Sequence, residues 1–401
     1  MPGTPNPADT ALMNLHRSLA LPLAILVLLA GCSTQAVPTP TPSSAPASPS
    51  ASAESSPSAQ PTPSASASTV TWVPAGVPEP PLGSAITSVV PGGDGLVGIG
   101  FDGGFGSIAW TSADGTGWRD ITPGGFVSHG IASVIPFSGG LVGVGRGDTI
   151  NVDANIAAAF LSEDGITWRP ADGGAQMQGQ LIDVVETDGG LFAVGGAPGA
   201  DAAGIWRSAD GEIWERTGGD FAAAFMWAIA EGGPGLVAVG WRRNPDPDLA
   251  VWTSSDGTDW TLAPDPEGFA GYEGTDVIDL DGTLVMVGTS FAGDEGRIWT
   301  STDGATWTLA DASVLDGGTA RRLAHTPDGL VAVGGRGIDA AAWRSTDGRS
   351  WEPLGQVVPN AYFAAAHATD AGLIVSGATQ EGKLETGIDV HAQVWIATLS
   401  D

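Results

Sequence analysis

The sequence predicts an all-β fold, a β-propeller of seven blades, and three observations support this prediction. A box of the form Ser-x-Asp-Gly-x-x-Trp occurs six times, and another aromatic residue stands eight positions before each closing tryptophan. A Gly-Leu-Val-type apolar run lies upstream of each box. The closing tryptophans are residues 118, 168, 214, 260, 307 and 351, so they recur 50, 46, 46, 47 and 44 residues apart. A period of about 40–50 residues is typical of a four-stranded propeller blade.

Each repeat predicts four strands in a fixed order. The innermost strand is a weak apolar run, the second is the Gly-Leu-Val run, the third carries the aromatic before the box, and the fourth begins near the box tryptophan. We expect the innermost strands at 86–90, 132–135, 181–185, 226–229, 276–280, 322–325 and 362–366. We expect the second strands at 96–99, 141–144, 191–194, 236–239, 284–287, 330–333 and 373–375. No stretch has the period of an amphipathic helix of useful length.

The residue types of the box are those that a tight turn needs. The Asp can accept hydrogen bonds from backbone N–H groups one or two residues on. The Gly after it can take the positive φ of a hairpin, and the Ser hydroxyl can satisfy further turn backbone. The two aromatic residues can pack across strands and between blades. These roles are structural, so we expect no catalytic residue among the six box aspartates.

The six boxes resemble a shortened form of the Asp-box (BNR) repeat, Ser-x-Asp-x-Gly-x-Thr-Trp, of sialidase-like propellers. All six copies in this chain lack the residue between Asp and Gly. The resemblance extends from about residue 70 to the end of the chain. It implies the fold and leaves the activity open, because one fold hosts many functions.

The two ends of the repeat region complement each other. The segment Thr69–Pro74 matches the strand that follows each box, and Trp72 is in phase, 46 residues before Trp118. Residues 372–377 are a seventh copy of the apolar run, and Val394–Ile396 is a seventh third strand with no box after it. We therefore expect the N-terminal strand to complete the last blade. That pairing closes the ring and removes open sheet edges.

Residues 1–32 predict a lipoprotein signal peptide. Arg17 precedes the apolar run Leu19–Ala30, which has the length of a signal-peptide core and is short for a membrane span. The run ends in Leu-Ala-Gly-Cys, which resembles the bacterial lipobox and implies that Cys32 is the acylated first residue of the mature protein. We expect translation to start at Met13, downstream of the first residue. The chain would then be extracytoplasmic and anchored by lipid to the bacterial cell membrane, in the cell envelope.

Residues 33–68 consist almost entirely of Ser, Pro, Ala and Thr. A segment with no apolar period and little charge cannot bury a core, so it predicts a disordered, solvated tether. The propeller would then occupy residues 69–401 as a single domain, and we expect a monomer. With one cysteine in the chain, no disulfide can form within it.

The formal net charge of −30, with Lys383 as the one lysine, limits the classes of partner. Nucleic acids and anionic membrane surfaces need clustered Lys and Arg. We therefore expect no nucleic-acid partner, and contact with the membrane through the lipid anchor only.

The two faces of the propeller are expected to differ in role. The box turns share one face with the first-to-second turns and keep a constant length. The connections on the other face, at 146–157, 241–249, 289–296, 335–340 and 378–392, vary in length, as expected where a surface is adapted for binding. The candidate ligand-binding residues are Arg146, Asp148, Asp153, Trp241, Arg242, Arg243, Tyr272, Arg336 and Asp339.

The resemblance makes a sialidase-like glycoside hydrolase the alternative function. Such an enzyme needs three arginines for the substrate carboxylate, a Tyr activated by a Glu, and an acidic Asp. The candidates are Arg146, Arg242 or Arg243, Arg336, the pair Tyr272-Glu273, and Asp148 or Asp153. Against this, the Phe-Arg-Ile-Pro-like motif is absent and the loop at 101–107 has no arginine. Neighbours on an extended chain also point apart, so we assign no catalytic residue.

A metal site is a further hypothesis. Asp148, Asn151, Asp153 and Asn155 alternate in a pattern that loosely resembles a calcium loop, but the turn Gly and the bidentate Glu are missing. This favours a solvated polar loop. The five histidines have no metal-ligand spacing, and no phosphate loop is present. We expect no metal and no cofactor.

The sequence thus favours a binding or scaffolding module for a glycan, a peptide or an envelope protein. Whether it is an enzyme stays open, with a binding module favoured. A third reading is an assembly factor, because similar propellers include photosystem assembly proteins, although the arginine patch that this role needs is only weakly present.

Overall fold

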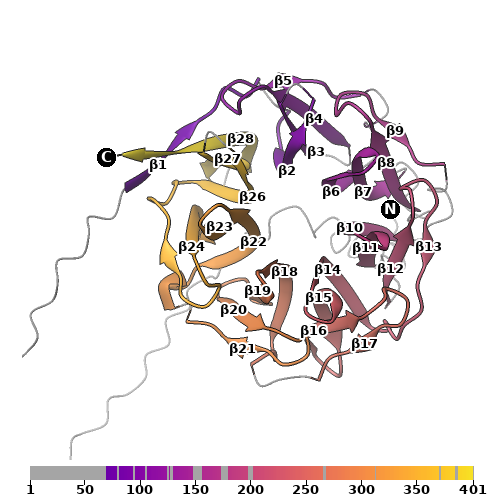
Figure 1. Cartoon of the computed structure of the whole chain (residues 1–401). Helices are drawn as coiled ribbons and strands as arrows, with labels where there is room; N and C mark the ends of the chain where they lie inside the picture. Colours follow the sequence, from indigo (N-terminus) through magenta and orange to yellow (C-terminus); the bar gives the residue numbers. More distant parts are fainter. Residues whose placement is uncertain are drawn as a thin grey trace, which may run out of the picture.

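The computed structural model describes residues 69–78, 81–93, 95–103, 106–123, 126, 130–147, 156–172, 179–196, 202–264, 268–311, 313–369, 372–383 and 387–400. Within these residues seven four-stranded sheets form a ring around one axis (Figure 1). The predicted seven-bladed β-propeller is confirmed. The signal peptide, Cys32 and the tether lie outside the described residues. In the described part, no helix has the length and apolar character needed to cross a membrane.

The strands follow the predicted order, and the blades are numbered 1 to 7 by their inner strands. The inner strands are β2 (Ser84–Gly92), β6 (Gly130–Phe137), β10 (Gln180–Thr187), β14 (Ala224–Gly232), β18 (Tyr272–Leu280), β22 (Thr319–Thr326) and β26 (Ala361–Thr369). The second strands are β3 (Gly95–Asp102), β7 (Gly140–Gly147), β11 (Gly190–Gly196), β15 (Gly235–Arg243), β19 (Thr283–Ser290), β23 (Gly329–Arg336) and β27 (Gly372–Lys383).

The outer half of each blade completes the sheet. The third strands are β4 (Ser107–Ser112), β8 (Ile156–Ser162), β12 (Ala203–Ser208), β16 (Pro247–Ser254), β20 (Gly296–Ser301), β24 (Asp339–Ser345) and β28 (Gly387–Ser400). The fourth strands are β5 (Arg119–Asp120), β9 (Arg169–Pro170), β13 (Glu215–Arg216), β17 (Thr261–Leu262), β21 (Thr308–Leu309), β25 (Glu352–Pro353) and, in blade 7, β1 (Thr69–Pro74). A short 3-10 helix, η3 (Ser313–Leu315), precedes β22.

The ring closes through the two ends of the described chain. Strand β1 pairs antiparallel with β28, so that Val70 lies opposite Leu399 and Pro74 opposite Trp395 (Figure 1). The rings of Trp72 and Trp395 both pack on Phe363, with centroids 5.1 and 5.2 Å away. The predicted closure of the last blade by the N-terminal strand is therefore confirmed.

The hydrophobic core lies between neighbouring blades. Trp206 and Trp214 of blade 3, for example, pack in one cluster with Val142 and Leu161 of blade 2. Five of the seven aromatic residues of the third strands are among the largest fully buried side chains, namely Trp110, Trp252, Trp299, Trp343 and Trp395. Burial of such large rings supplies much of the hydrophobic stabilisation of each blade interface.

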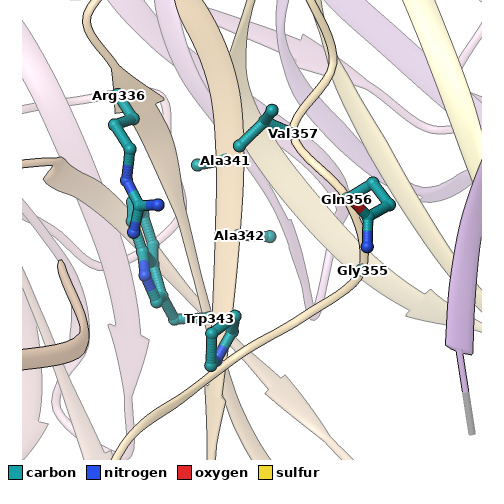
Figure 2. Close-up of a pocket in the computed structure, with 8 residues that line it drawn as sticks. Arg336, Ala341, Ala342, Trp343, Gly355, Gln356 and Val357 are labelled. Carbon is teal, nitrogen blue, oxygen red and sulfur yellow. The ribbon is translucent and has the colours of Figure 1, made fainter. Parts of the chain in front are cut away.

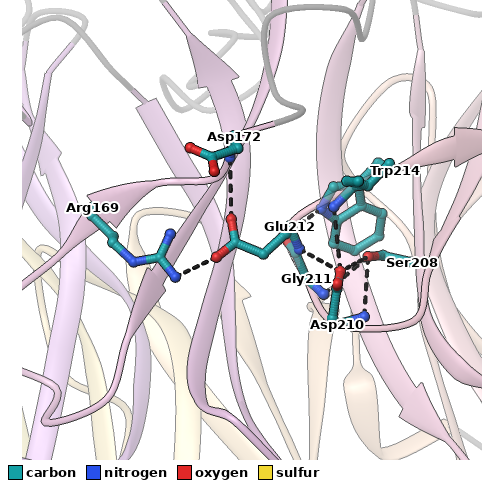
Figure 3. Close-up of polar contacts among 8 residues, drawn as sticks. Arg169, Asp172, Ser208, Asp210, Gly211, Glu212 and Trp214 are labelled. Carbon is teal, nitrogen blue, oxygen red and sulfur yellow. Dashed lines mark hydrogen bonds and ion pairs between the residues drawn. The ribbon is translucent and has the colours of Figure 1, made fainter.

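The box turns are held by the contacts that their residue types predict (Figure 3). In blade 3, Ser208 Oγ accepts the N–H of Gly211 at 2.9 Å, and Trp214 Nε1 donates to the carbonyl of Gly211 at 2.9 Å. Asp210 Oδ1 accepts the N–H of Glu212 at 2.9 Å. All three bonds recur in the other five boxes. The structural role of the box is confirmed.

Blade contacts on this side also include an ion pair. Glu212 of the blade 3 box pairs with Arg169 of blade 2 and accepts the N–H of Asp172 at 3.1 Å (Figure 3). The Arg169 guanidinium lowers the pKa of Glu212.

Two of the predicted loops are wrong in part, because their strands continue. Strands β15 and β16 pair as far as Arg243 opposite Pro247, and β27 and β28 pair as far as Lys383 opposite Gly387. Both hairpins extend beyond the apolar pattern, since backbone hydrogen bonds hold a ladder even where side chains are polar. The fourth strands of blades 1 to 6 begin directly after the box tryptophan, as predicted.

Candidate functional site

The face opposite the boxes, here called the loop face, carries most of the predicted site residues. It is formed by the second-to-third connections and by the segments that lead from one blade to the next inner strand. Asp148 and Asp153 lie outside the described residues. The other candidates lie at strand ends on this face: Arg146 on β7, Trp241, Arg242 and Arg243 on β15, Tyr272 on β18, Arg336 on β23 and Asp339 on β24.

Every inner strand contains a bulge at the same place, which the sequence did not predict. The bulged residues are Thr87, Ala132, Ile182, Trp227, Thr275, Arg321 and Ala364. A bulge re-aims the side chain of its extra residue, and bulges gather next to functional sites. Among these seven bulged residues, Trp227 of blade 4 and Arg321 of blade 6 have the large side chains that end in hydrogen-bond donors.

Four aromatic residues form one cluster on the loop face, here called the aromatic cluster: Phe225, Trp227, Trp241 and Phe291. The ring of Phe225 lies 4.6 Å from that of Trp227 and 6.4 Å from that of Trp241, to which it is nearly parallel at 13°. Trp241 meets Phe291 edge to face at 6.5 Å. Phe291 is 38% exposed and the other three are partly exposed. The cluster therefore offers flat apolar surface to a ligand.

A carboxylate adjoins the aromatic cluster at the start of blade 5. Glu273 Oε2 accepts a hydrogen bond of 2.9 Å from Trp227 Nε1, which links the inner strands of blades 4 and 5. Burial raises the pKa of Glu273, and the Trp227 hydrogen bond and the charge of Arg321 oppose this shift. Arg321 is open to solvent, yet the surrounding protein lowers the pKa of its guanidinium by desolvation.

The arginines around the cluster already have partners. Arg242 forms an ion pair of 2.9 Å with Asp220, and Arg243 lies over the Trp241 ring at 5.8 Å. Arg297 pairs with Glu295 at 3.1 Å and stacks over the Tyr272 ring at 4.2 Å. Among the described residues, Asp220 and Glu295 therefore neutralise Arg242 and Arg297, which weakens the positive charge that a carboxylate clamp needs.

Tyr272 and Glu273 contact different groups. Tyr272 is buried against Trp299, with ring centroids 5.8 Å apart, while Glu273 bonds to Trp227. Burial and the hydrogen bond to Glu295 raise the pKa of Tyr272 to about 12. A phenol with a raised pKa is a weak nucleophile near neutral pH. The two side chains do not form the nucleophile and base pair that a sialidase mechanism needs.

Arg336 and Asp339 lie in blade 6, at the β23–β24 turn. Arg336 Nη2 donates to the carbonyls of Val314 and Leu315 at 3.0 and 3.1 Å, and Asp339 Oδ1 accepts the N–H of Asn360 at 3.0 Å. The Arg336 guanidinium and Trp343 line a cavity of about 240 Å³ (Figure 2). Arg146 is half-buried at the end of β7, and burial lowers its pKa.

Polar residues that follow the bulges tie blades together near the axis. Asp183 accepts hydrogen bonds from Ser133 Oγ at 2.9 Å and from the N–H of Ile229 at 3.0 Å. Asp276 accepts the N–H of Leu323 at 2.7 Å. Burial raises the pKa of Asp183, and it raises that of Asp276 to about 7. Among the described residues no group of three or more His, Cys, Asp and Glu side chains is arranged to hold a metal ion.

Sequence reasoning missed Phe225, Trp227, Phe291 and Arg321. One signal was present, because Trp227 and Trp241 are the two tryptophans that lie off the repeat positions. A tryptophan that the fold does not need at a fixed place is available for recognition. No sequence pattern distinguished Phe225, Phe291 or Arg321 from other residues of the repeats.

No protein-family model and no curated protein matches the chain. Solved structures do match. The chain is similar to YCF48 bound to a D1 peptide, with 16% identity, a TM-score of 0.50, and 82% of this chain and 96% of that chain covered. It is also similar to virginiamycin B lyase from Staphylococcus aureus, with 12% identity, a TM-score of 0.54, and 82% and 99% covered.

A sialidase is among the matching structures as well. The Trypanosoma rangeli sialidase in complex with the inhibitor DANA has 13% identity and a TM-score of 0.42, with 80% of this chain and 60% of that chain covered. At such identities the likeness extends to the fold alone. Sialidases and other propellers share the architecture, and they differ in what they do.

Proposed function

We propose that this protein is a binding or scaffolding module, with the aromatic cluster of blades 4 and 5 as its ligand-binding surface. One observation supports this most. The two tryptophans that the repeat does not use, Trp227 and Trp241, meet through Phe225 in one partly exposed cluster on the loop face. Trp and Tyr give large rigid contact area at small conformational cost, and they are enriched where binding energy is concentrated.

The ligand is a glycan, a peptide or an envelope protein. The peptide bound to YCF48 supports a peptide as one option, since propellers of this architecture can carry such a ligand. Flat aromatic surface rimmed by paired charges, such as Arg242 with Asp220, suits sugar rings as well as apolar side chains. We place the module outside the cytoplasm on a lipid anchor at Cys32, which follows from the lipobox alone.

A sialidase-like hydrolase is the alternative, and two observations weigh against it. Tyr272 has a pKa raised to about 12 and is separated in its contacts from Glu273. Arg242 of blade 4 is neutralised by Asp220, whereas Arg336 lies in blade 6 and donates to backbone carbonyls there. These arginines therefore do not act as one clamp on a substrate carboxylate.

The experiment is a glycan array and a peptide array probed with the purified full chain, together with a fluorogenic sialoside assay. Trp241→Ala should reduce binding to any hit by at least about tenfold, because truncation of a central aromatic residue costs 2 kcal/mol or more. Ile213→Ser is the matched control, since Ile213 is a 62% exposed apolar residue on a box turn. Equal loss in both variants, or sialoside turnover by the wild type, would contradict the proposal.

A further inference from the structure

A cavity lies in blade 6, apart from the aromatic cluster, between the outer strands and the segment that leads to blade 7. Its lining is Arg336, Ala341, Ala342, Trp343, Pro353, Gly355, Gln356 and Val357. Figure 2 shows the Arg336 guanidinium on one side of the space, Val357 and Gln356 on the other, and Ala341 and Ala342 between them. The walls are mostly apolar, and Arg336 is the one charged group among the lining residues.

The Arg336 guanidinium is fixed in place by backbone. Nη2 donates to the carbonyls of Val314 and Leu315, and Trp343 Nε1 donates to the same Val314 carbonyl at 3.3 Å. These bonds orient the group without neutralising its charge. Arg336 has no ion-pair partner among the described residues, and its Nε is buried with no hydrogen-bond partner there.

The repeat supplies a direct comparison. Arg242 in blade 4 and Arg336 in blade 6 each stand fifteen residues after the bulge of their own blade, at Trp227 and Arg321. Arg242 is neutralised by Asp220, which lies in the segment before its inner strand. The position that corresponds to Asp220 in blade 6 is Val314, because each lies seven residues before its bulge. Blade 6 thus keeps the arginine and lacks the acid.

Nearby acids do not take the place of Asp220. Asp339, opposite Arg336 in the turn, accepts the N–H of Asn360. Glu352 on β25 pairs with Arg344 at 2.7 Å. A cation without a counter-charge costs free energy when it is partly buried, and a carboxylate in the cavity would supply that counter-charge.

We infer that this cavity binds a carboxylate group attached to a small apolar body. Nη2 is already occupied by the two backbone carbonyls, so the remaining positive charge of the guanidinium is what favours a carboxylate over a neutral group. The apolar walls and the Trp343 ring suit an aliphatic side chain. At about 240 Å³ the cavity is smaller than the about 300–1,000 Å³ usual for drug-sized ligands. It therefore fits a group the size of one residue, which is either a free branched-chain acid or the C-terminal residue of a peptide.

Isothermal titration calorimetry on the full chain tests this inference with four probes. These are isovalerate, its neutral isostere isovaleramide, and a hexapeptide that ends in leucine with a free or an amidated C-terminus. We expect both carboxylates to bind at least about tenfold more tightly than their amides, since a hydrogen bond to a charged group is worth about 1.5–3 kcal/mol. Tighter binding of the peptide acid identifies a chain end as the natural ligand, and equal binding identifies a free acid.

Three variants assign the binding to the cavity. Arg336→Met should abolish the preference for acid over amide, while Arg344→Met should leave it unchanged because Arg344 lies in the same blade and is already paired with Glu352. Val357 is 41% exposed, so Val357→Trp should fold normally and block the cavity even if Arg336→Met destabilises blade 6. The inference is overturned if acids and amides bind equally, if neither acid binds at millimolar concentration, or if Val357→Trp binds like the wild type.

Discussion

The indole nitrogen of Trp227 and the carboxylate of Glu273 lie 2.9 Å apart, and their hydrogen bond joins the inner strands of two neighbouring blades at the edge of the aromatic cluster. Trp227 occupies the bulge of β14, and its ring packs against Phe225. Glu273 stands at the start of the next inner strand. The same pair therefore supports the blade 4–5 interface and sets the orientation of one ring of the proposed binding surface.

Trp227→Phe should destabilise the protein by about 1–3 kcal/mol, because Glu273 then loses a donor while partly buried. Phenylalanine keeps a ring against Phe225, so the loss reports the hydrogen bond more than the packing. Urea unfolding of Trp227→Phe, Glu273→Gln and the double variant measures the coupling. A double variant whose free-energy loss equals the sum of the two single losses would show that the two side chains do not interact.

The raised pKa of the Asp276 carboxyl group predicts that the stability of the protein depends on pH. Burial, and to a lesser degree the charge of Asp183, raise its pKa in the folded state to about 7, against an ordinary value near 4, while Arg322 opposes the shift. The folded state then holds more protons than the unfolded state between these values. Its contribution to stability is full below about pH 4 and is lost as the pH rises to about 7.

Asp276→Asn isolates this contribution, because asparagine does not titrate. The wild type should be most favoured over the variant at about pH 4, and the difference in unfolding free energy should shift toward the variant by about pH 8. Chemical denaturation of both proteins across this range measures it. A difference that is constant with pH, or that moves toward the wild type, would contradict the raised pKa.

Two glycines with positive φ allow the cost of the left-handed backbone to be measured apart from the cost of a steric clash. Gly257 of the blade 4 box has φ 72°, and a Cβ there would lie 2.1 Å from Phe192 Cε1. Gly282 has φ 83° in the β18–β19 turn, and nothing lies within 4 Å of its added Cβ. Gly282→Ala should cost about 1–2 kcal/mol from the left-handed backbone alone. Gly257→Ala should cost clearly more by thermal or urea unfolding, and equal losses would be the contrary result.

The architecture was predictable because each box repeats the same contacts. Ser254, Asp256, Gly257 and Trp260 form within seven residues the hydrogen bonds that end a third strand, so local sequence carries the whole motif. Trp72 is in phase with the repeat, and this predicted that the N-terminal strand pairs with β28 to close the ring. What depends on a residue and its chain neighbours was visible in the sequence.

The candidate site was only partly predictable because it is assembled across blades. Trp241 and Arg243 were identified from a variable connection, but Phe225 reaches them from another strand, and Phe291 from another blade. The bulge that re-aims Trp227 has no signature in the residues of β14. Arg242 pairs with Asp220, whereas Arg336 has no ion-pair partner among the described residues, and this difference likewise depends on which segment crosses the end of each blade.

The most direct measurement is hydrogen exchange on the full chain with and without the array hit. The binding surface proposed here predicts slower exchange in residues 224–227, 239–243 and 289–292, which carry the aromatic cluster, and unchanged exchange in the six box turns. Protection confined to the box turns, with the aromatic cluster unaffected, would contradict the assignment of the loop face as the ligand-binding side of the propeller.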